Sequence, residues 1–123
     1  MKLTIYVYDK CSTCRKALKF LDEKGVTYDK IAIREQPPTK TELRSMLKAY
    51  DGELKRLFNT SGQDYRQLGI KDQLAEMSEA EAIDLLAGNG NLIKRPFTIA
   101  TGKKPIALVG FKEDLWTEAL SKA

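Results

Sequence analysis

The chain of 123 residues contains no histidine. This absence excludes a histidine general base, Ser-His and Cys-His nucleophile pairs, and every zinc site that needs imidazole. No run approaches the roughly 18 apolar residues of a transmembrane helix, and the alternating start "MKLTIYVYDK" is too short for a signal peptide. We therefore expect a cytoplasmic protein without membrane contact, whose chemistry relies on cysteine, carboxylate, lysine, arginine, tyrosine or backbone groups.

The chain also lacks a concentration of charge of one sign. Its net charge is +4 and its pI is near 9.0, but acidic and basic residues are interspersed along most of the sequence. No basic cluster contains interleaved aromatic residues, so we expect no direct binding of nucleic acid. A solvated surface of mixed sign is the simplest interpretation, and the small positive excess would assist binding of an anion or an acidic partner protein.

The first third of the chain predicts a strand–helix–strand unit. Residues 3–8 and 26–33 are rich in β-branched and aromatic residues or alternate between apolar and polar, as strands do. Between them, apolar residues recur at helical spacing until Gly25, a typical helix stop. The length of this unit suits parallel pairing of its two strands.

Residues of about 35–90 predict a helical insert within a single domain of residues 1–123. Thr39 or Thr41 is expected to cap its first helix, and Ser78 with Glu81 has the spacing of a capping box. No linker-like composition separates the insert from its flanks. We therefore predict one domain and not two.

The last third predicts a β-hairpin and a closing helix. The stretches "LIKRPFTIA" and "PIALVGF" read as strands joined by a turn with Gly102 at its tip. The final stretch, "KEDLWTEALSKA", is amphipathic and predicts a helix. Its apolar side chains are expected to pack in the core; they are Leu115, Trp116 and Leu120.

The only two cysteines, Cys11 and Cys14, lie in "YVYDKCSTCRKAL" between a predicted strand and helix. A zinc site would need two further soft ligands, which only a second chain could supply, so we expect no metal. A structural disulfide would close a loop of four residues, where the entropic gain is smallest. A pair of unrelated buried cysteines and a reactive dithiol are the remaining interpretations.

The position of Cys11 favours the reactive dithiol. Its sulfur would face the unpaired N–H groups at a helix start, and Lys10, Arg15 and Lys16 add positive charge. Surroundings of this kind bring cysteine pKa values to roughly 3.5–7.5, from about 8.5 for a free thiol. Cys14 would follow one turn later, at roughly 5–6 Å between Cβ atoms. Cys11 is then the attacking thiol and Cys14 the resolving thiol.

Four segments together resemble the arsenate reductase (ArsC)/Spx family of glutaredoxin-like proteins, over essentially the whole chain. They are "YDKCSTCRKAL", "REQPPTKTEL", "LFNTSGQDYRQLGI" and "LIKRPFTI". The resemblance implies an α/β fold of the thioredoxin/glutaredoxin type, with a mixed four-stranded sheet and a helical insert. It also implies a thiol–disulfide oxidoreductase that binds no cofactor and is reduced by glutathione, glutaredoxin or thioredoxin.

Members of the family that reduce arsenate hold the oxyanion with three arginines, and the resemblance assigns one of these to Arg95. Asn59 and Gly110 stand near the other two positions, and Arg66 is a candidate substitute. One arginine offers an oxyanion fewer charge-assisted hydrogen bonds than three, each worth roughly 1.5–3 kcal/mol. The sequence therefore leaves a small oxyanion and a disulfide as alternative substrates.

The resemblance further implies that the Arg95–Pro96 peptide bond is cis, that Pro96 faces the active cysteine, and that Arg95 lies beside Cys11. The expected site is formed by residues around this proline and the cysteine pair. Its catalytic residues are Cys11, Cys14 and Arg95, and its substrate-binding residues are Ser12, Thr13, Arg95 and Pro96.

A function of a different class stays open beside the enzyme. Spx-like members of the family carry the Cys-x-x-Cys pair and are redox-switched regulators that can bind RNA polymerase. The resemblance thus allows a regulator or adaptor that binds a protein partner without turnover. Oxidation of Cys11 and Cys14 would then alter the start of a helix and with it a binding surface.

Overall fold

The computed structural model describes residues 3–102 and 105–121. These residues form two compact units: the first comprises the described residues through Ala32 and from Arg95 onward, and the second is Ile33–Lys94. The second unit begins and ends within a few residues of the predicted insert. That one domain comprises both units stays a prediction.

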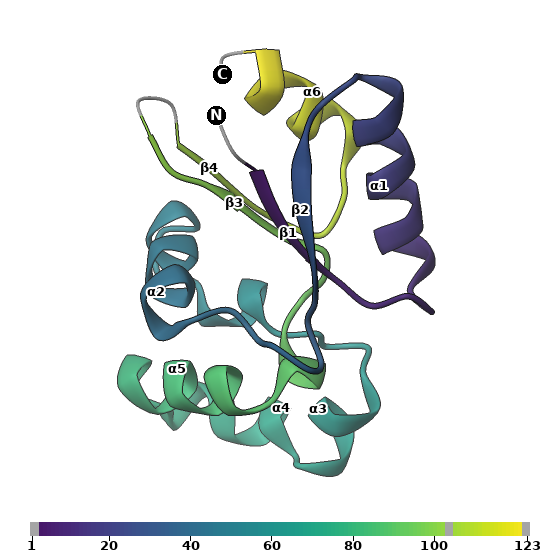
Figure 1. The fold of residues 1–123 in the computed structure, drawn as a ribbon. Coiled ribbons are helices and arrows are strands. Elements are labelled where there is room, and N and C mark those ends of the chain that lie inside the picture. Colours follow the sequence, from purple (N-terminus) through teal and green to yellow (C-terminus); the bar gives the residue numbers. More distant parts are fainter. Residues whose placement is uncertain (1–2, 103–104, 122–123) are drawn as a thin grey trace. The chain divides into compact units, whose positions relative to one another are not determined.

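The first unit contains a mixed four-stranded sheet (Figure 1). Its strands are β1 (Leu3–Val7), β2 (Tyr28–Ala32), β3 (Phe97–Ala100) and β4 (Ile106–Val109), in the order β2–β1–β3–β4. β1 pairs in parallel with β2 and antiparallel with β3, and β3 pairs antiparallel with β4. The predicted fold class and the predicted parallel pairing are confirmed.

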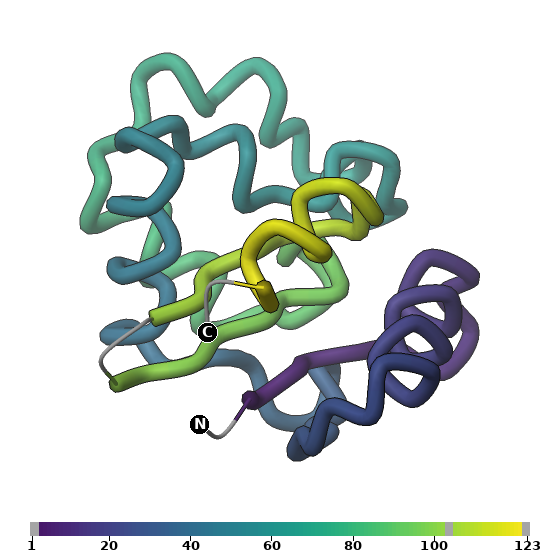
Figure 2. Tube along the Cα trace, turned by 90° about the horizontal axis from the view of Figure 1, so that it is seen from above, coloured from purple at the N-terminus to yellow at the C-terminus, as the bar shows by residue number. Residues whose placement is uncertain are grey.

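β3 is shorter than its sequence pattern predicted. It begins only after Pro96, and Leu92 belongs instead to a short 3-10 helix. Proline has no N–H to donate to a ladder, so it commonly marks the start of a strand. The β3–β4 pairing is that of the expected hairpin (Figure 2), with Gly102 at φ +128°, while its tip at 103–104 lies outside the described residues.

Two helices supply the rest of the first unit's core: α1 (Ser12–Glu23) and α6 (Glu113–Ser121). Alternate residues of β1 face a cluster that includes side chains of both helices, because side chains of a strand point to opposite faces in turn. The buried members of this cluster are Leu3, Ile5, Val7, Cys14, Ala17, Phe20, Leu21, Ala100, Ile106 and Trp116. Cys14 is therefore part of the hydrophobic core.

One predicted core residue of the last helix is wrong. Trp116 is 1% exposed and Leu120 is partly buried, but Leu115 is 47% exposed. Neighbouring residues on a helix point about 100° apart, so only one of them can lie at the centre of the buried face. Trp116 takes the inward position, where its ring contacts Phe20 and Phe111 edge to face.

The second unit is helical, as predicted. Its helices are α2 (Lys40–Ala49), η1 (Leu54–Leu57), α3 (Gln63–Gln67), α4 (Ile70–Gln73), η2 (Leu74–Glu76), α5 (Glu79–Gly88) and η3 (Gly90–Leu92), where η marks a 3-10 helix. Among the described residues, no helix of the chain is long and apolar enough to cross a bilayer.

Both predicted cap positions of this unit are helix starts in the structure. Thr39, not Thr41, caps α2, and its side chain and that of Glu42 each accept a hydrogen bond from the other's backbone N–H. Ser78 and Glu81 form the predicted capping box of α5. These reciprocal bonds satisfy backbone donors that would otherwise be unpaired at a helix start.

The two ends of the second unit meet at Gly90. This glycine is buried, and a Cβ built on it would collide with the backbone carbonyl of Ile33. Nearby, the N–H of Lys94 donates to the carbonyl of Leu57 at 2.8 Å. The segment that leads from this unit toward β3 is thus held by backbone contacts that leave no space for a side chain at residue 90.

We expect Gly90→Ala to lower the free energy of unfolding by about 1–3 kcal/mol or more, since the added methyl must displace backbone. Gly88→Ala is the matched control, because a Cβ there meets nothing within 4 Å, and its effect should stay within about 1 kcal/mol. Urea unfolding of both variants measures the difference. Equal midpoints would contradict the close approach of Gly90 to Ile33.

Candidate active site at the start of the first helix

Cys11 is the N-cap residue of α1, as its place between strand and helix predicted. Its backbone is extended, with φ −89° and ψ 115°, and its N–H donates to the carbonyl of Tyr8 at 3.0 Å. Its Sγ accepts a hydrogen bond from the backbone N–H of Cys14, at 3.3 Å between nitrogen and sulfur. The sulfur therefore occupies the position that a capping oxygen usually fills.

Cys14 lies one turn further on and is 1% exposed, whereas Cys11 is partly exposed. Burial raises the pKa of the Cys14 thiol to about 12, and a hydrogen bond with Cys11 and the charge of Cys11 add to this. A hydrogen bond from the Tyr8 backbone and the charge of Arg95 act in the opposite direction. At neutral pH Cys14 is protonated, and both cysteines are free thiols.

The Arg95–Pro96 peptide bond is cis, which confirms that prediction. Arg95 precedes β3, and its Cζ lies 5.0 Å from the centroid of the Tyr8 ring, a cation–π distance. Its Nη1 is buried and makes no hydrogen bond within the described part of the chain. The contacts found for Arg95 therefore involve Tyr8 and, through its charge, Cys14; a position beside Cys11 itself stays a prediction.

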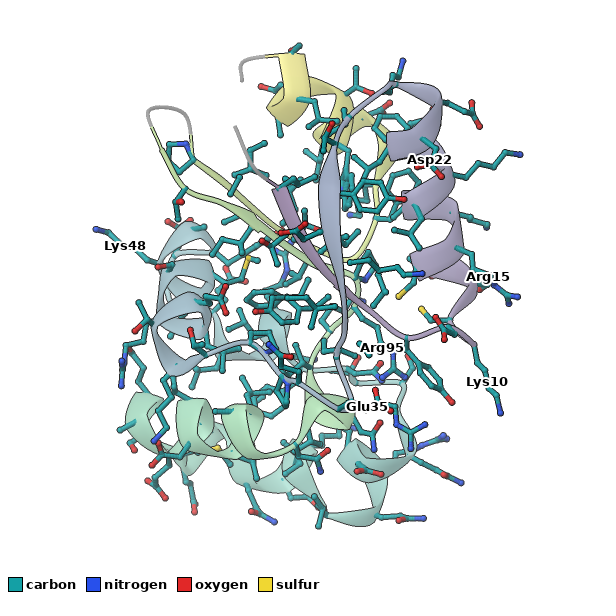
Figure 3. The ribbon with its side chains drawn as sticks, in the orientation of Figure 1. Lys10, Arg15, Asp22, Glu35, Lys48 and Arg95 are labelled. Carbon is teal, nitrogen blue, oxygen red and sulfur yellow. The ribbon has the colours of Figure 1, made fainter. Side chains whose placement is uncertain are left out.

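The remaining predicted residues of the first turn differ in exposure. Ser12 is exposed and Thr13 is half-buried. Lys10 and Arg15 are exposed and extend outward from the start of α1 (Figure 3), so water and salt screen their charges. The cations that the sequence suggested for the thiolate thus lie in solvent, and the local electrostatics depend more on the backbone donor and on Arg95.

The two positions near the family's other arginines have structural roles of their own. Gly110 has φ +73°, a conformation that side chains disfavour, and its carbonyl accepts a hydrogen bond from the Trp116 indole at 3.2 Å. In the second unit, Asn59 donates its amide to the carbonyl of Asn91 at 3.5 Å. Arg66, the candidate substitute, is exposed and donates to the carbonyl of Ser61; its role in the site stays a prediction.

Sequence reasoning missed Tyr8, which it treated only as the last residue of a strand. Its carbonyl, its backbone hydrogen bond to Cys14 and its ring place it in contact with Cys11, Cys14 and Arg95. The antiparallel pairing of β1 with β3, which brings the two segments to the same end of the sheet, was not predicted from the sequence. For the residues that the structure describes, no group of three or more histidine, cysteine, aspartate or glutamate side chains forms a metal site.

With this geometry in view, comparison with protein families identifies the chain. The model of the ArsC family matches residues 6–119. The chain belongs to the ArsC family. This membership, together with structural neighbours described as arsenate reductases, places it in a thiol oxidoreductase-like class with a thioredoxin-like fold.

Two similar proteins span nearly the whole chain. The uncharacterized protein YusI of Bacillus subtilis (strain 168) is 51% identical over 118 residues, which cover 96% of this chain and 98% of YusI. The crystal structure of a possible arsenate reductase from Streptococcus mutans UA159 is 47% identical with a TM-score of 0.83, covering 92% of this chain and 96% of that one. The likeness to YusI is one of sequence, and the likeness to the Streptococcus mutans protein extends to the fold.

A third relative is named as a transcriptional regulator. The global transcriptional regulator Spx of Streptococcus pyogenes serotype M1 is 29% identical over 112 residues, which cover 91% of this chain and 80% of Spx. A possible arsenate reductase and a transcriptional regulator thus both stand among the relatives of this chain.

We expect iodoacetamide at pH 7 to label Cys11 of the folded protein and to leave Cys14 unlabelled. Cys14 is buried, and its thiol pKa of about 12 leaves almost no thiolate at that pH. Intact-mass measurement should show one adduct in the wild type, rapid labelling of Cys14→Ser, and labelling of Cys11→Ser only after unfolding. Labelling of both cysteines at similar rates in the folded wild type would contradict this assignment.

Proposed function

We propose that the chain is a cytoplasmic thiol–disulfide oxidoreductase of the arsenate reductase-like class. In this proposal Cys11 is the nucleophile, Cys14 is the resolving thiol, and Arg95 stabilises a thiolate or a bound anion. The observation that carries it is the asymmetry of the pair. Cys11 is partly exposed and accepts a backbone hydrogen bond at a helix start, whereas Cys14 is buried and keeps its proton.

The first step is attack on a disulfide R–S–S–R by the Cys11 thiolate. A Cys11–S–S–R bond forms as the substrate S–S bond breaks, and the RS⁻ that leaves takes a proton from water. Cys11 then no longer carries a charge or a thiol hydrogen bond, so two of the causes that raise the Cys14 pKa disappear. Resolution is thereby favoured only after Cys11 has reacted.

In the second step Cys14 loses its proton to water and its thiolate attacks the Cys11 sulfur. A Cys11–Cys14 disulfide forms and a second RS⁻ leaves, so the protein has lost two electrons and the substrate has gained them. A thiol reductant, which is glutathione, glutaredoxin or thioredoxin, then returns two electrons and two protons to the pair. No bound cofactor takes part.

The same site is proposed to bind the substrate. Ser12 and Thr13 begin α1, where backbone N–H groups lack partners within the helix, and Arg95 with Pro96 contributes from the start of β3. Gly110 and Asn59 bring no positive charge, so an oxyanion would lose hydrogen bonds worth roughly 1.5–3 kcal/mol each. We therefore propose a disulfide as the preferred substrate over arsenate.

A regulator is the second candidate, supported by the likeness to Spx. Because the Sγ of Cys11 itself caps α1, a Cys11–Cys14 disulfide would change the hydrogen bond at the helix start. The altered surface would then govern binding to a partner such as RNA polymerase, without turnover. The regulator hypothesis uses the same thiol pair as the enzyme hypothesis, but it involves no conversion of a substrate.

Turnover coupled to NADPH oxidation separates the two candidates. With glutathione and glutaredoxin, or with thioredoxin, we expect the wild type to reduce a small disulfide faster than arsenate. Cys11→Ser should abolish this activity, since no other thiol can make the first attack, and Cys14→Ser should lower it.

The opposite result is equally informative. If the wild type shows no turnover with either substrate, yet forms a Cys11–Cys14 disulfide under mild oxidant, the enzyme proposal is contradicted and the regulator is favoured. Activity retained in Cys11→Ser would contradict the assignment of the nucleophile.

A further inference from the structure

We propose that Tyr8 is a positioning residue for the resolving step, because its ring holds the guanidinium of Arg95 and its backbone holds the turn that carries Cys11 and Cys14. This inference rests on the proposed thiol–disulfide function and assigns a role to a residue outside the expected site. It also gives Arg95 a target within the protein itself, beside its proposed part in substrate binding.

The register of the sheet brings the two side chains together. β1 and β3 are antiparallel, with Tyr6 opposite Phe97. Tyr8 directly follows β1, and Arg95 lies two residues before Phe97, so both lie beyond the same end of this ladder although they are far apart in the sequence. The 5.0 Å between the Arg95 Cζ and the Tyr8 ring centroid shows the resulting contact, in which the guanidinium meets the negative face of the ring.

The backbone of Tyr8 fixes the cysteine turn at the same point. Its carbonyl accepts the N–H of Cys11 at 3.0 Å. Its backbone also forms a hydrogen bond with Cys14 that lowers the pKa of the Cys14 thiol, and the charge of Arg95 lowers this pKa as well. One residue therefore connects the nucleophile's turn, the resolving thiol and the arginine.

The guanidinium of Arg95 would be stabilised by a negative charge formed close to it. Its Nη1 is buried and has no hydrogen-bond partner among residues 3–102 and 105–121. A buried charged donor without a partner is unfavourable, and a new negative charge nearby relieves this cost. The Cys14 thiolate is such a charge, and it exists only between loss of the Cys14 proton and attack on Cys11.

The step is written as Cys14–SH plus Cys11–S–S–R giving Cys11–S–S–Cys14 plus RSH. The Cys14 proton passes to water, the thiolate forms the new S–S bond, and the RS⁻ that leaves takes up a proton. By this stage Cys11 is in the mixed disulfide and does not titrate. Burial still raises the pKa of Cys14 at this stage, and the Tyr8 backbone and the charge of Arg95 are the two influences that still lower it.

A chromogenic disulfide, dithiobis(nitrobenzoate), reports the two steps separately in single turnovers of the reduced full chain. The first coloured thiolate is released by attack of Cys11 and the second by attack of Cys14. We expect Tyr8→Leu to slow the second release roughly fivefold to thirtyfold, the range expected for a lost cation–π contact that is partly to fully desolvated. The first release should change much less, and the pH midpoint of the second should move upward, because the thiolate has lost a positioned cation.

Two further variants test whether Tyr8 acts through Arg95. Tyr8→Phe keeps the ring and should restore most of the rate of the second release. Arg95→Gln should be slow in the second release, and the double variant with Tyr8→Leu should be no slower than Arg95→Gln alone. Additive effects, or a Tyr8→Phe variant as slow as Tyr8→Leu, would overturn the role of the ring.

The chain offers a matched control in the second unit. There the Arg56 Cζ lies 4.8 Å from the ring centroid of Tyr50, and neither cysteine belongs to that unit. Tyr50→Leu removes a comparable contact and should change neither release.

The remaining outcomes separate this inference from the function on which it rests. If the wild type gives one release, as Cys14→Ser must, the resolving role itself fails. If the wild type gives both and Tyr8→Leu leaves the second unchanged, or slows both equally, only the role of Tyr8 is overturned.

Discussion

The candidate site is organised by one hydrogen bond, from the backbone N–H of Cys14 to the Sγ of Cys11. It makes the reactive sulfur part of the structure that starts α1, because the sulfur takes the place of a capping oxygen. It also fixes the difference between the two thiols. Cys11 caps the helix and is partly exposed, whereas Cys14, one turn further on, lies in the core. The proposed division of labour, with Cys11 attacking and Cys14 resolving, is based on this difference.

The cations around the site differ in their exposure to solvent, and this difference matters more than their number. Lys10 and Arg15 extend into solvent, where their effect on a thiolate is screened, while the buried Nη1 of Arg95 is not exposed to water. Arg95 directly precedes the cis proline Pro96, just before β3. The N–H of Gly110 donates a hydrogen bond to the carbonyl of Pro96 at 2.9 Å. A single, held cation suits a thiolate that forms once per cycle better than it suits a multiply charged oxyanion.

Local features of the sequence predicted much of this structure. Cys11 at a helix start and the capping box of Ser78 could be predicted because caps depend on residues within one turn. The exposure of Leu115 could not, since its sequence pattern fits the core as well as that of Trp116 and only packing chooses between them. The contact of Tyr8 with Arg95 depends on the register between strands from opposite ends of the chain, which no local pattern specifies. Local patterns therefore predicted the order of strands and helices, and the family resemblance predicted the fold class, whereas the full site could not be predicted.

The central claim is tested most directly by trapping the first intermediate. The reduced wild type, Cys14→Ser and Cys11→Ser are each mixed with oxidised glutathione at neutral pH, and their intact masses are measured. The account predicts a stable glutathione adduct on Cys14→Ser, an internal disulfide in the wild type, and no adduct on folded Cys11→Ser. An adduct that forms on Cys11→Ser as readily as on Cys14→Ser would contradict it, because the buried cysteine would then be the one that attacks.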